Sequence, residues 1–278
     1  MKCEVDLIGD YLDKLLHKLD SELDKCKAHP SEKSVHDTRV CLRRIMAAVE
    51  ILDTVSQTDE TISQKHLKRL KEIHKIFSPI RDTQISMLYA HEMINEFPSI
   101  GIFEEYLESR EKRLSFKLQK KLSDTDTYPL HKVLKAVKLE VAERFGENGL
   151  LGDLRSTTDR AFSKVVELIG QVDTDDIKSV HKVRIAFKRF RYMVELLDVL
   201  QPIEEYLLNG MKAIQDELGA IQDITVVEEL LQRFIEKKSP SGRLLSLEYH
   251  ELLSRRKKLA ESFAASAVDI KNMWSVLK

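Results

Sequence analysis

One internal repeat limits the possible folds of this chain more than any other feature. Three pairs of segments match in the same order along the sequence, two of them 145 positions apart and the third 141 apart. The pairs are VHDTRVCLRRI at 35–45 with VHKVRIAFKRF at 180–190, SREKRL at 109–114 with SRRKKL at 254–259, and IRDT at 80–83 with IQDI at 221–224. Chance similarity of Lys-rich segments does not keep order and spacing, so the sequence predicts a duplicated unit.

The duplicated unit is expected to be all-α. Only 9 Gly and 6 Pro interrupt 278 residues that are 42% apolar and 33% charged, a composition typical of a soluble globular protein with long helices. We predict repeat 1 at about 1–125, a connecting helix at about 126–149 that ends at Gly146 or Gly149, and repeat 2 at about 150–278. The expected helices lie near 4–28, 35–55, 60–77, 80–97 and 100–122, then 128–147, then 154–171, 180–200, 203–218, 220–237 and 242–275. Short connections favour antiparallel neighbours, so each repeat is expected to be a bundle of four or five helices.

Apolar and cationic residues separate by helical phase in the first matched pair. At about 100° per residue, one apolar stripe on each helix faces the core. The stripes are Val35, Thr38, Leu42, Ile45, Val49 and Leu52, and Val180, Val183, Phe187, Phe190, Val194 and Leu197. Cations follow beside each stripe at helical spacing. These ladders are His36, Arg39 and Arg43 in repeat 1, and His181, Arg184, Lys188 and Arg191 in repeat 2.

The two ladders indicate a phosphate-rich ligand. Like charges on one helical face cost a few tenths of a kcal/mol per pair, which a bound anion would offset. Ser34 and Ser179 are expected N-caps, which would place both histidines in a first turn that favours anions. Arg offers forked donors to phosphate, Lys a point charge, and His a donor that strengthens on protonation. A single cationic run is usually a solvated face, and its recurrence in both repeats is what favours binding.

Other cations are weaker candidates. Arg44 and Arg189 lie beside the ladders, away from the core stripes. The lower-ranked residues, which also match between repeats, are Lys71, Arg110, Arg113, Lys212, Arg255 and Lys258. The acids that end the ladders, Glu50 and Glu195, are expected to orient the last cation. No catalytic residue, metal ligand or cofactor is assigned.

Charge, cysteine content and the length of apolar runs limit the partners and the cellular locations that the sequence predicts. The formal net charge is −1, so overall charge predicts no partner. Three cysteines, all within the first 41 residues, make no disulfide framework and fit a reducing cytoplasm. No apolar run is long enough to span a bilayer, and no export signal is recognisable, so we expect a cytoplasmic protein.

The matched segments, together with Arg81-Asp82 and Gly219 to Asp223, resemble the conserved histidine α-helical domain, or CHAD, over nearly the whole length. The resemblance implies two pseudo-symmetric four-helix-type bundles that flank a basic central groove or pore and bind inorganic polyphosphate. It implies that the groove is lined by His36, Arg39, Arg43, His181, Arg184, Lys188 and Arg191. Met46 stands where repeat 2 has Arg191, a departure that predicts weaker binding by the first ladder.

Some members of the family carry a triphosphate-processing domain of the CYTH type. None of the 278 residues here has that pattern, so we expect a stand-alone module that does no catalysis itself. A separate polyphosphate- or triphosphate-processing enzyme is a possible partner, and polyphosphate granules are a possible location.

Three rival interpretations remain. His36-Asp37 is also the literal pair of an HD-type metal-dependent phosphohydrolase, although Lys182 replaces the acid in repeat 2. A nucleic-acid binder would use the same cations, although aromatic residues are only 6% of the chain and few are free to stack. A helical scaffold for protein partners is the third.

Overall fold

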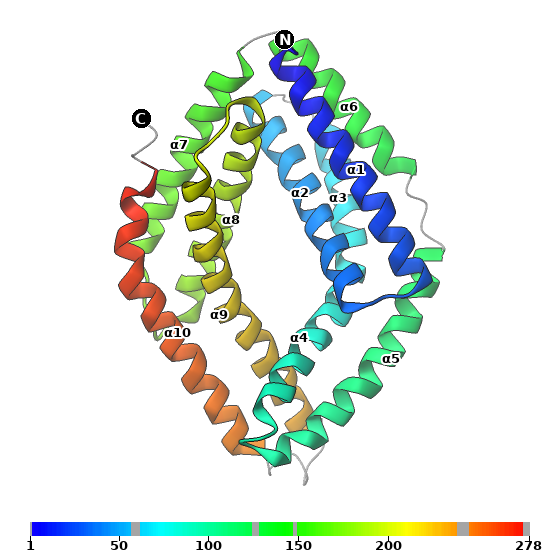
Figure 1. Cartoon of the computed structure of the whole chain (residues 1–278), viewed down its shortest axis with the longest axis vertical. Helices are drawn as coiled ribbons and strands as arrows, with labels where there is room; N and C mark the ends of the chain where they lie inside the picture. The colour runs from blue at the N-terminus through cyan, green and yellow to red at the C-terminus, as the bar shows by residue number, and fades with distance from the viewer. Residues whose placement is uncertain (1, 57–61, 124–127, 147–148, 238–244, 275–278) are drawn as a thin grey trace. The chain divides into compact units, whose positions relative to one another are not determined.

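All regular structure in the described residues is helical, which confirms the predicted all-α class (Figure 1). The computed structural model describes residues 2–56, 62–123, 128–146, 149–237 and 245–274. The elements are α1 (Glu4–Ala28), α2 (Glu32–Ser56), α3 (Ile62–Ile76), α4 (Ser78–Met93), the 3-10 helix η1 (Pro98–Ile100), α5 (Gly101–Ser123), α6 (Tyr128–Phe145), α7 (Leu150–Ile169), α8 (Ile177–Leu200), α9 (Glu205–Lys237) and α10 (Ser246–Met273). No helix in these ranges is both long enough and apolar enough to cross a membrane.

The chain divides into two compact units that each draw on both halves of the sequence. Unit 1 comprises residues 1–79, 115–162 and 188–204, and unit 2 comprises 80–114, 163–187 and 205–278. Helices α5, α7 and α8 contribute a part to each unit, and the first two residues of α4 belong to unit 1 and the rest to unit 2. The predicted sequence repeats and these compact units are therefore different divisions of the chain.

Four helices of unit 1, α1, α2, α3 and α6, pack side by side (Figure 1). Their contact faces are apolar, because Leu12 and Leu19 of α1, Leu42 of α2 and Val133 of α6 are each at most 1% exposed. Burial of a Leu or Val side chain contributes about 1.5 to 3 kcal/mol. This bundle fixes the direction of α2, which carries the first predicted ladder.

Unit 2 has its own core between α4, η1, α5, α9 and α10. Aromatic rings lie at its centre: Phe234 of α9 contacts Phe103 and Tyr106 of α5, with ring centroids 5.4 and 4.9 Å apart. The core orients α9, which packs along α10 and faces the first turns of α8 in a pocket described below.

Both predicted apolar stripes are buried. Each of the twelve residues, Thr38 included, is at most 5% exposed. The Thr38 hydroxyl lies 3.4 Å from the sulfur of Cys26, which supplies a polar partner inside the core. The helical phase of the sequence therefore gives the correct inward face of α2 and α8.

Several predicted helix ends are correct, and one predicted break is wrong. Gly146 has φ 55 and directly follows α6, so it ends the connecting helix as expected. Helix α9, in contrast, continues through Gly219, where the sequence predicted a break between two helices. The buried residues Leu218 and Ile221 on either side hold the helix against the core, and tertiary packing outweighs the low helix propensity of one glycine. The first residues of the predicted helices at 60 and 242 lie outside the described ranges.

The glycine inside α9 gives a stability prediction. A Cβ added at Gly219 would meet no atom within 4 Å, so Gly219→Ala should raise the free energy of unfolding by about 0.5 to 1 kcal/mol. Gly149, with φ 108, is the contrasting position, and Gly149→Ala should destabilise the protein. Urea denaturation of both variants measures the difference, and equal effects of the two changes would contradict the continuous helix.

Candidate anion-binding site

The N-termini of the two ladder helices lie further upstream than the sequence predicted. Ser31 caps α2, because its hydroxyl oxygen accepts a hydrogen bond from the Ser34 amide at 3.1 Å. Asp176 caps α8, because its carboxylate accepts from the Lys178 amide at 3.0 Å. The prediction that Ser34 and Ser179 are the N-caps is therefore wrong.

The ladder histidines lie outside the first turn of their helices. His36 and His181 are each the fifth residue of their helix, beyond the first-turn amides that lack helical partners. Both side chains are exposed. Any role in anion binding rests on the side chains themselves and on their neighbours, and not on the helix terminus.

In unit 1, cations from two helices converge on His74 of α3. Arg39 and Arg43 of α2 and Lys188 of α8 all act on the His74 ring; we call these four residues the His74 cluster. Arg39 also donates hydrogen bonds to the Ser78 hydroxyl at 2.8 Å and to the His74 backbone carbonyl at 3.4 Å. Burial, followed by the repulsion of the three cations, lowers the pKa of His74 to about 3. The ring is therefore neutral at physiological pH, inside a strongly positive environment.

A second group in unit 1 is built on Glu195 of α8. Its carboxylate lies 3.1 Å from Nε of Arg44 on α2 and 3.6 Å from Nη2 of Arg191 one turn earlier. Burial raises the pKa of the neighbouring Tyr11 to about 12, and the Glu195 charge adds to the effect, so the phenol stays neutral. Glu195 thus orients the last cation of its ladder, as predicted, and it also neutralises part of the charge of Arg44.

Loss of the Glu195 charge should lower the stability of the protein and raise its affinity for a polyanion. Glu195 and Arg191 are only 18% and 17% exposed, so Glu195→Gln, which leaves two guanidinium groups without their anion, should cost about 1 to 3 kcal/mol of folding free energy. The same change frees two cations and should tighten the binding of a polyanion. Urea denaturation and a binding titration measure the two effects.

Glu167→Gln, which breaks an exposed pair with Lys164, is the control and should change stability by less than about 0.5 kcal/mol. Equal, small losses for both variants would contradict a structural role for Glu195.

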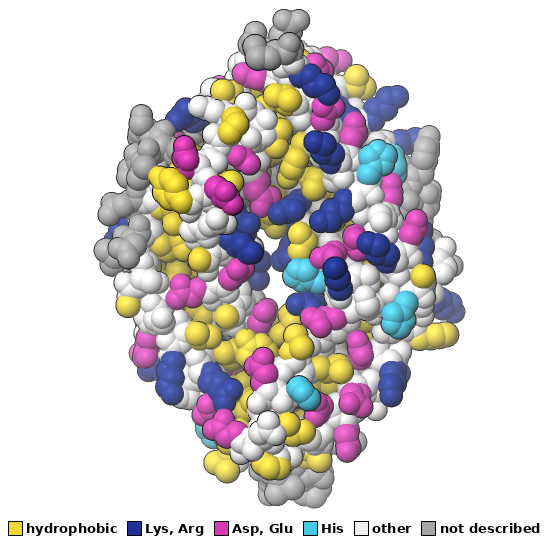
Figure 2. Space-filling model, in the orientation of Figure 1, with side chains coloured by type: hydrophobic (Ala, Val, Ile, Leu, Met, Phe, Trp, Pro, Cys, Tyr) yellow, Lys and Arg dark blue, Asp and Glu magenta, His cyan; other side chains and the backbone are white. Residues whose placement is uncertain are grey.

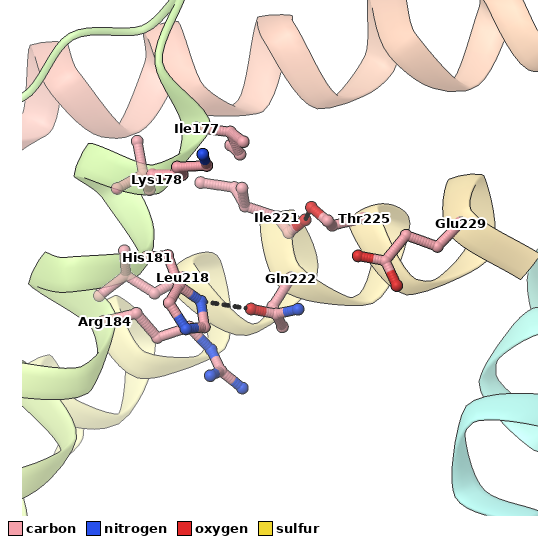
Figure 3. Close-up of a pocket in the computed structure, with 10 residues that line it drawn as sticks. Ile177, Lys178, His181, Arg184, Leu218, Ile221, Gln222, Thr225 and Glu229 are labelled. Atoms are coloured by element: carbon pink, nitrogen blue, oxygen red, sulfur yellow. Dashed lines mark hydrogen bonds between the residues drawn. The ribbon is translucent and has the colours of Figure 1, made fainter. Parts of the chain in front are cut away.

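In unit 2, His181 and Arg184 of α8 line a pocket against α9. Figure 3 shows both side chains directed toward Gln222, whose Oε1 lies 2.7 Å from Nδ1 of His181. The pocket has a volume of about 300 Å³, and its remaining lining is Ile177, Lys178, Val180, Leu218, Ile221, Thr225 and Glu229. The bond to Gln222 fixes the orientation of the His181 ring in this pocket.

The lower-ranked cations differ in their surroundings. Lys71 pairs with Glu50 at 2.9 Å. Arg110 donates to the Thr83 hydroxyl at 3.0 Å, and Arg255 pairs with Glu251 at 2.6 Å and Glu96 at 3.0 Å. These contacts give Lys71, Arg110 and Arg255 protein partners in the absence of a ligand. Arg113, Arg189, Lys212 and Lys258 are exposed, as are Lys71 and the two ladder histidines.

The structure brings together part of the predicted set. Arg39, Arg43 and Lys188 meet around His74 in unit 1, and His181 meets Arg184 in the pocket of unit 2. His36 belongs to unit 1 and His181 to unit 2, so a groove shared by both ladders stays a prediction. On the face shown in Figure 2, cationic and acidic side chains are interspersed.

Two residues of the site were not predicted. His74 follows Lys71 by three positions on α3, which is the helical spacing that could have drawn attention to it. Gln222 lies in the segment that matches between repeats, but nothing in the sequence marks it as the partner of His181. In the described ranges, no group of three or more His, Cys, Asp or Glu side chains could hold a metal ion.

The fold and these clusters define an all-α protein that presents cationic side chains in both of its units. The model of the CHAD domain family matches residues 10–232, so the chain belongs to the CHAD domain family. Among solved structures, the crystal structure of the CHAD domain from the plant Ricinus communis is similar, with a TM-score of 0.76, 16% identity, and coverage of 95% of this chain and 92% of that one. PptA from Streptomyces chartreusis has a TM-score of 0.70 and 11% identity over 99% of this chain and all of its own. Comparison with curated proteins gives no match.

Proposed function

We propose that this protein binds inorganic polyphosphate and does not alter it chemically. The observation that carries the proposal is the His74 cluster, in which cationic residues of α2 and α8 act on one side chain of α3. The charges that lower the pKa of His74 are those of Arg39, Arg43 and Lys188. An anion at this point would be attracted by all three cations, and guanidinium groups are well suited to phosphate oxygens.

A linear phosphate polymer suits this site better than a compact anion. Successive ladder positions on α2 and on α8 are about 5 to 6 Å apart, so a ladder offers a row of cations and not a single cavity. Membership of the CHAD domain family supports the same ligand, because the resemblance noted in the sequence implies polyphosphate binding. The proposal includes a cytoplasmic location, polyphosphate granules as one site of action, and a separate polyphosphate- or triphosphate-processing enzyme as a partner.

Incubation of the purified protein with polyphosphate of defined length tests both parts of the proposal. We expect saturable binding in a calorimetric titration at low salt, with no release of inorganic phosphate and no change in polymer length on a gel. Absence of binding would overturn the proposed function. Metal-dependent release of phosphate that is lost on changing Asp37 would favour the HD-type phosphohydrolase instead.

A further inference from the structure

His74 has an unusual environment for a histidine that only supports the fold. Its Nε2 atom is buried and has no hydrogen-bond partner within the described residues. The backbone carbonyl of the same residue, in contrast, accepts from Arg39. A buried polar atom without a partner destabilises the folded protein, and most buried polar atoms in proteins have one. A ligand that supplies the missing partner would remove this penalty.

The charged groups around the ring indicate the chemistry of that ligand. The charges of Arg39 and Arg43 on α2 and of Lys188 on α8 act on the ring. Nε of Arg43 is a further buried nitrogen with no hydrogen-bond partner in the described ranges. Two unsatisfied nitrogens within one cationic cluster are complementary to an oxyanion that accepts several hydrogen bonds.

We propose that His74 is a phosphate ligand of the unit 1 cluster that is neutral in the free protein and takes up a proton when a phosphate chain binds. Phosphate oxygens reach Nε2 when the long arginine and lysine side chains around it turn onto the anion. The protonated ring donates from Nε2 to a phosphate oxygen. The inference rests on the proposed function and adds a mode of regulation to it: affinity rises as pH falls.

The sign of the pH effect follows from the two states of the ring. In the free protein, burial and the three cations hold the pKa of His74 near 3, so the ring carries no proton at pH 6 to 8. Bound phosphate reverses the local field and raises the pKa. Where the complex binds one more proton than the free protein, affinity increases up to tenfold for each unit by which the pH falls.

This role belongs to the first repeat alone. The position equivalent to His74 at the 141-residue offset is Gln215, which cannot take up a proton. Met46 stands in the first ladder where the second has Arg191, so the α2 ladder has one cation fewer. A proton gained by His74 on binding would restore that charge at acidic pH.

Calorimetry of polyphosphate binding to the full chain, in two buffers of different ionisation enthalpy near pH 6.5, counts the protons taken up. We expect His74→Gln to reduce proton uptake and to flatten a three- to tenfold gain in affinity between pH 7 and pH 6. The matched control is His131→Gln in the same unit, whose ring pairs with Asp20 at 42% exposure, and it should leave both quantities unchanged. Variants at His36 and His181 separate any contribution of the ladder histidines.

The outcomes distinguish this inference from the proposed function. If no variant and no wild-type sample binds polyphosphate, the proposed function fails and the inference fails with it. If wild-type protein binds but His74→Gln retains the full proton uptake and pH dependence, only the inference is overturned. NMR of the His74 ring in the unmodified protein gives an answer independent of variants: the ring should protonate near neutral pH only when polyphosphate is present, and a ring that stays neutral in the complex would overturn the inference.

Discussion

Replacing Arg43 with glutamine should weaken polyphosphate binding by about 1.5 to 3 kcal/mol, or roughly 10- to 150-fold. Arg43 is half-buried at the middle of α2 and contributes to the positive field at His74. Its Nε has no hydrogen-bond partner in the described part of the chain, so the change breaks no protein hydrogen bond at that nitrogen. Removal of one of several like charges should leave the stability unchanged or slightly higher. Calorimetric titration and thermal denaturation measure the two quantities.

Arg43 is a better test than Arg39. Arg39 bonds to Ser78 and to the His74 carbonyl, so its loss would also loosen the junction between α3 and α4. A change at Arg39 would therefore lower stability as well as affinity, whereas a change at Arg43 tests affinity more directly. The matched control is Arg69→Gln, which removes an arginine of the same unit that pairs with Glu72 on the surface of α3. Equal affinity losses for the two variants would mean that only the overall charge of the protein matters. An unchanged affinity for Arg43→Gln would show that the His74 cluster is not part of the binding site.

Raising the salt concentration from 50 to 200 mM should weaken binding by about 50-fold if four cations contact the polymer. A single-stranded polyanion releases about 0.7 counterions for each charge neutralised, so the logarithm of affinity falls linearly with the logarithm of salt concentration. Titrations at several salt concentrations measure the slope. Arg43→Gln should reduce the slope by about 0.7, whereas Arg69→Gln should not change it. A slope near zero would contradict binding through the cationic ladders.

The sequence predicted those features that depend on helical periodicity. Every residue of the two apolar stripes is buried, from Val35 to Leu197, because side chains three and four positions apart share a face whatever the tertiary fold. The same periodicity placed Arg39 and Arg43 on one side of α2, where both act on His74. The connecting helix was predicted to end at Gly146 or Gly149, and it ends at Gly146, because glycine tolerates the left-handed backbone found there.

The features that the sequence did not predict depend on contacts between distant segments or on competition between similar local signals. Two polar residues near the start of each ladder helix can act as the cap, and the structure uses Ser31 and Asp176 in place of Ser34 and Ser179. The pairing of Glu195 with Arg44 joins α8 to α2, and no pattern within either helix specifies it. The role of His74 likewise emerges only when α2, α3 and α8 are brought together.

The central claim is that the ladders select a phosphate chain for its charge and not for any base. Competition between polyphosphate and single-stranded RNA with the same number of phosphates, measured by displacement of labelled polyphosphate at one salt concentration, tests this claim most directly. We predict that unlabelled polyphosphate displaces the label at a concentration at least tenfold lower than RNA does, and that Arg43→Gln weakens polyphosphate binding. Displacement by RNA at an equal or lower concentration would contradict the account and would identify the protein as a nucleic-acid binder.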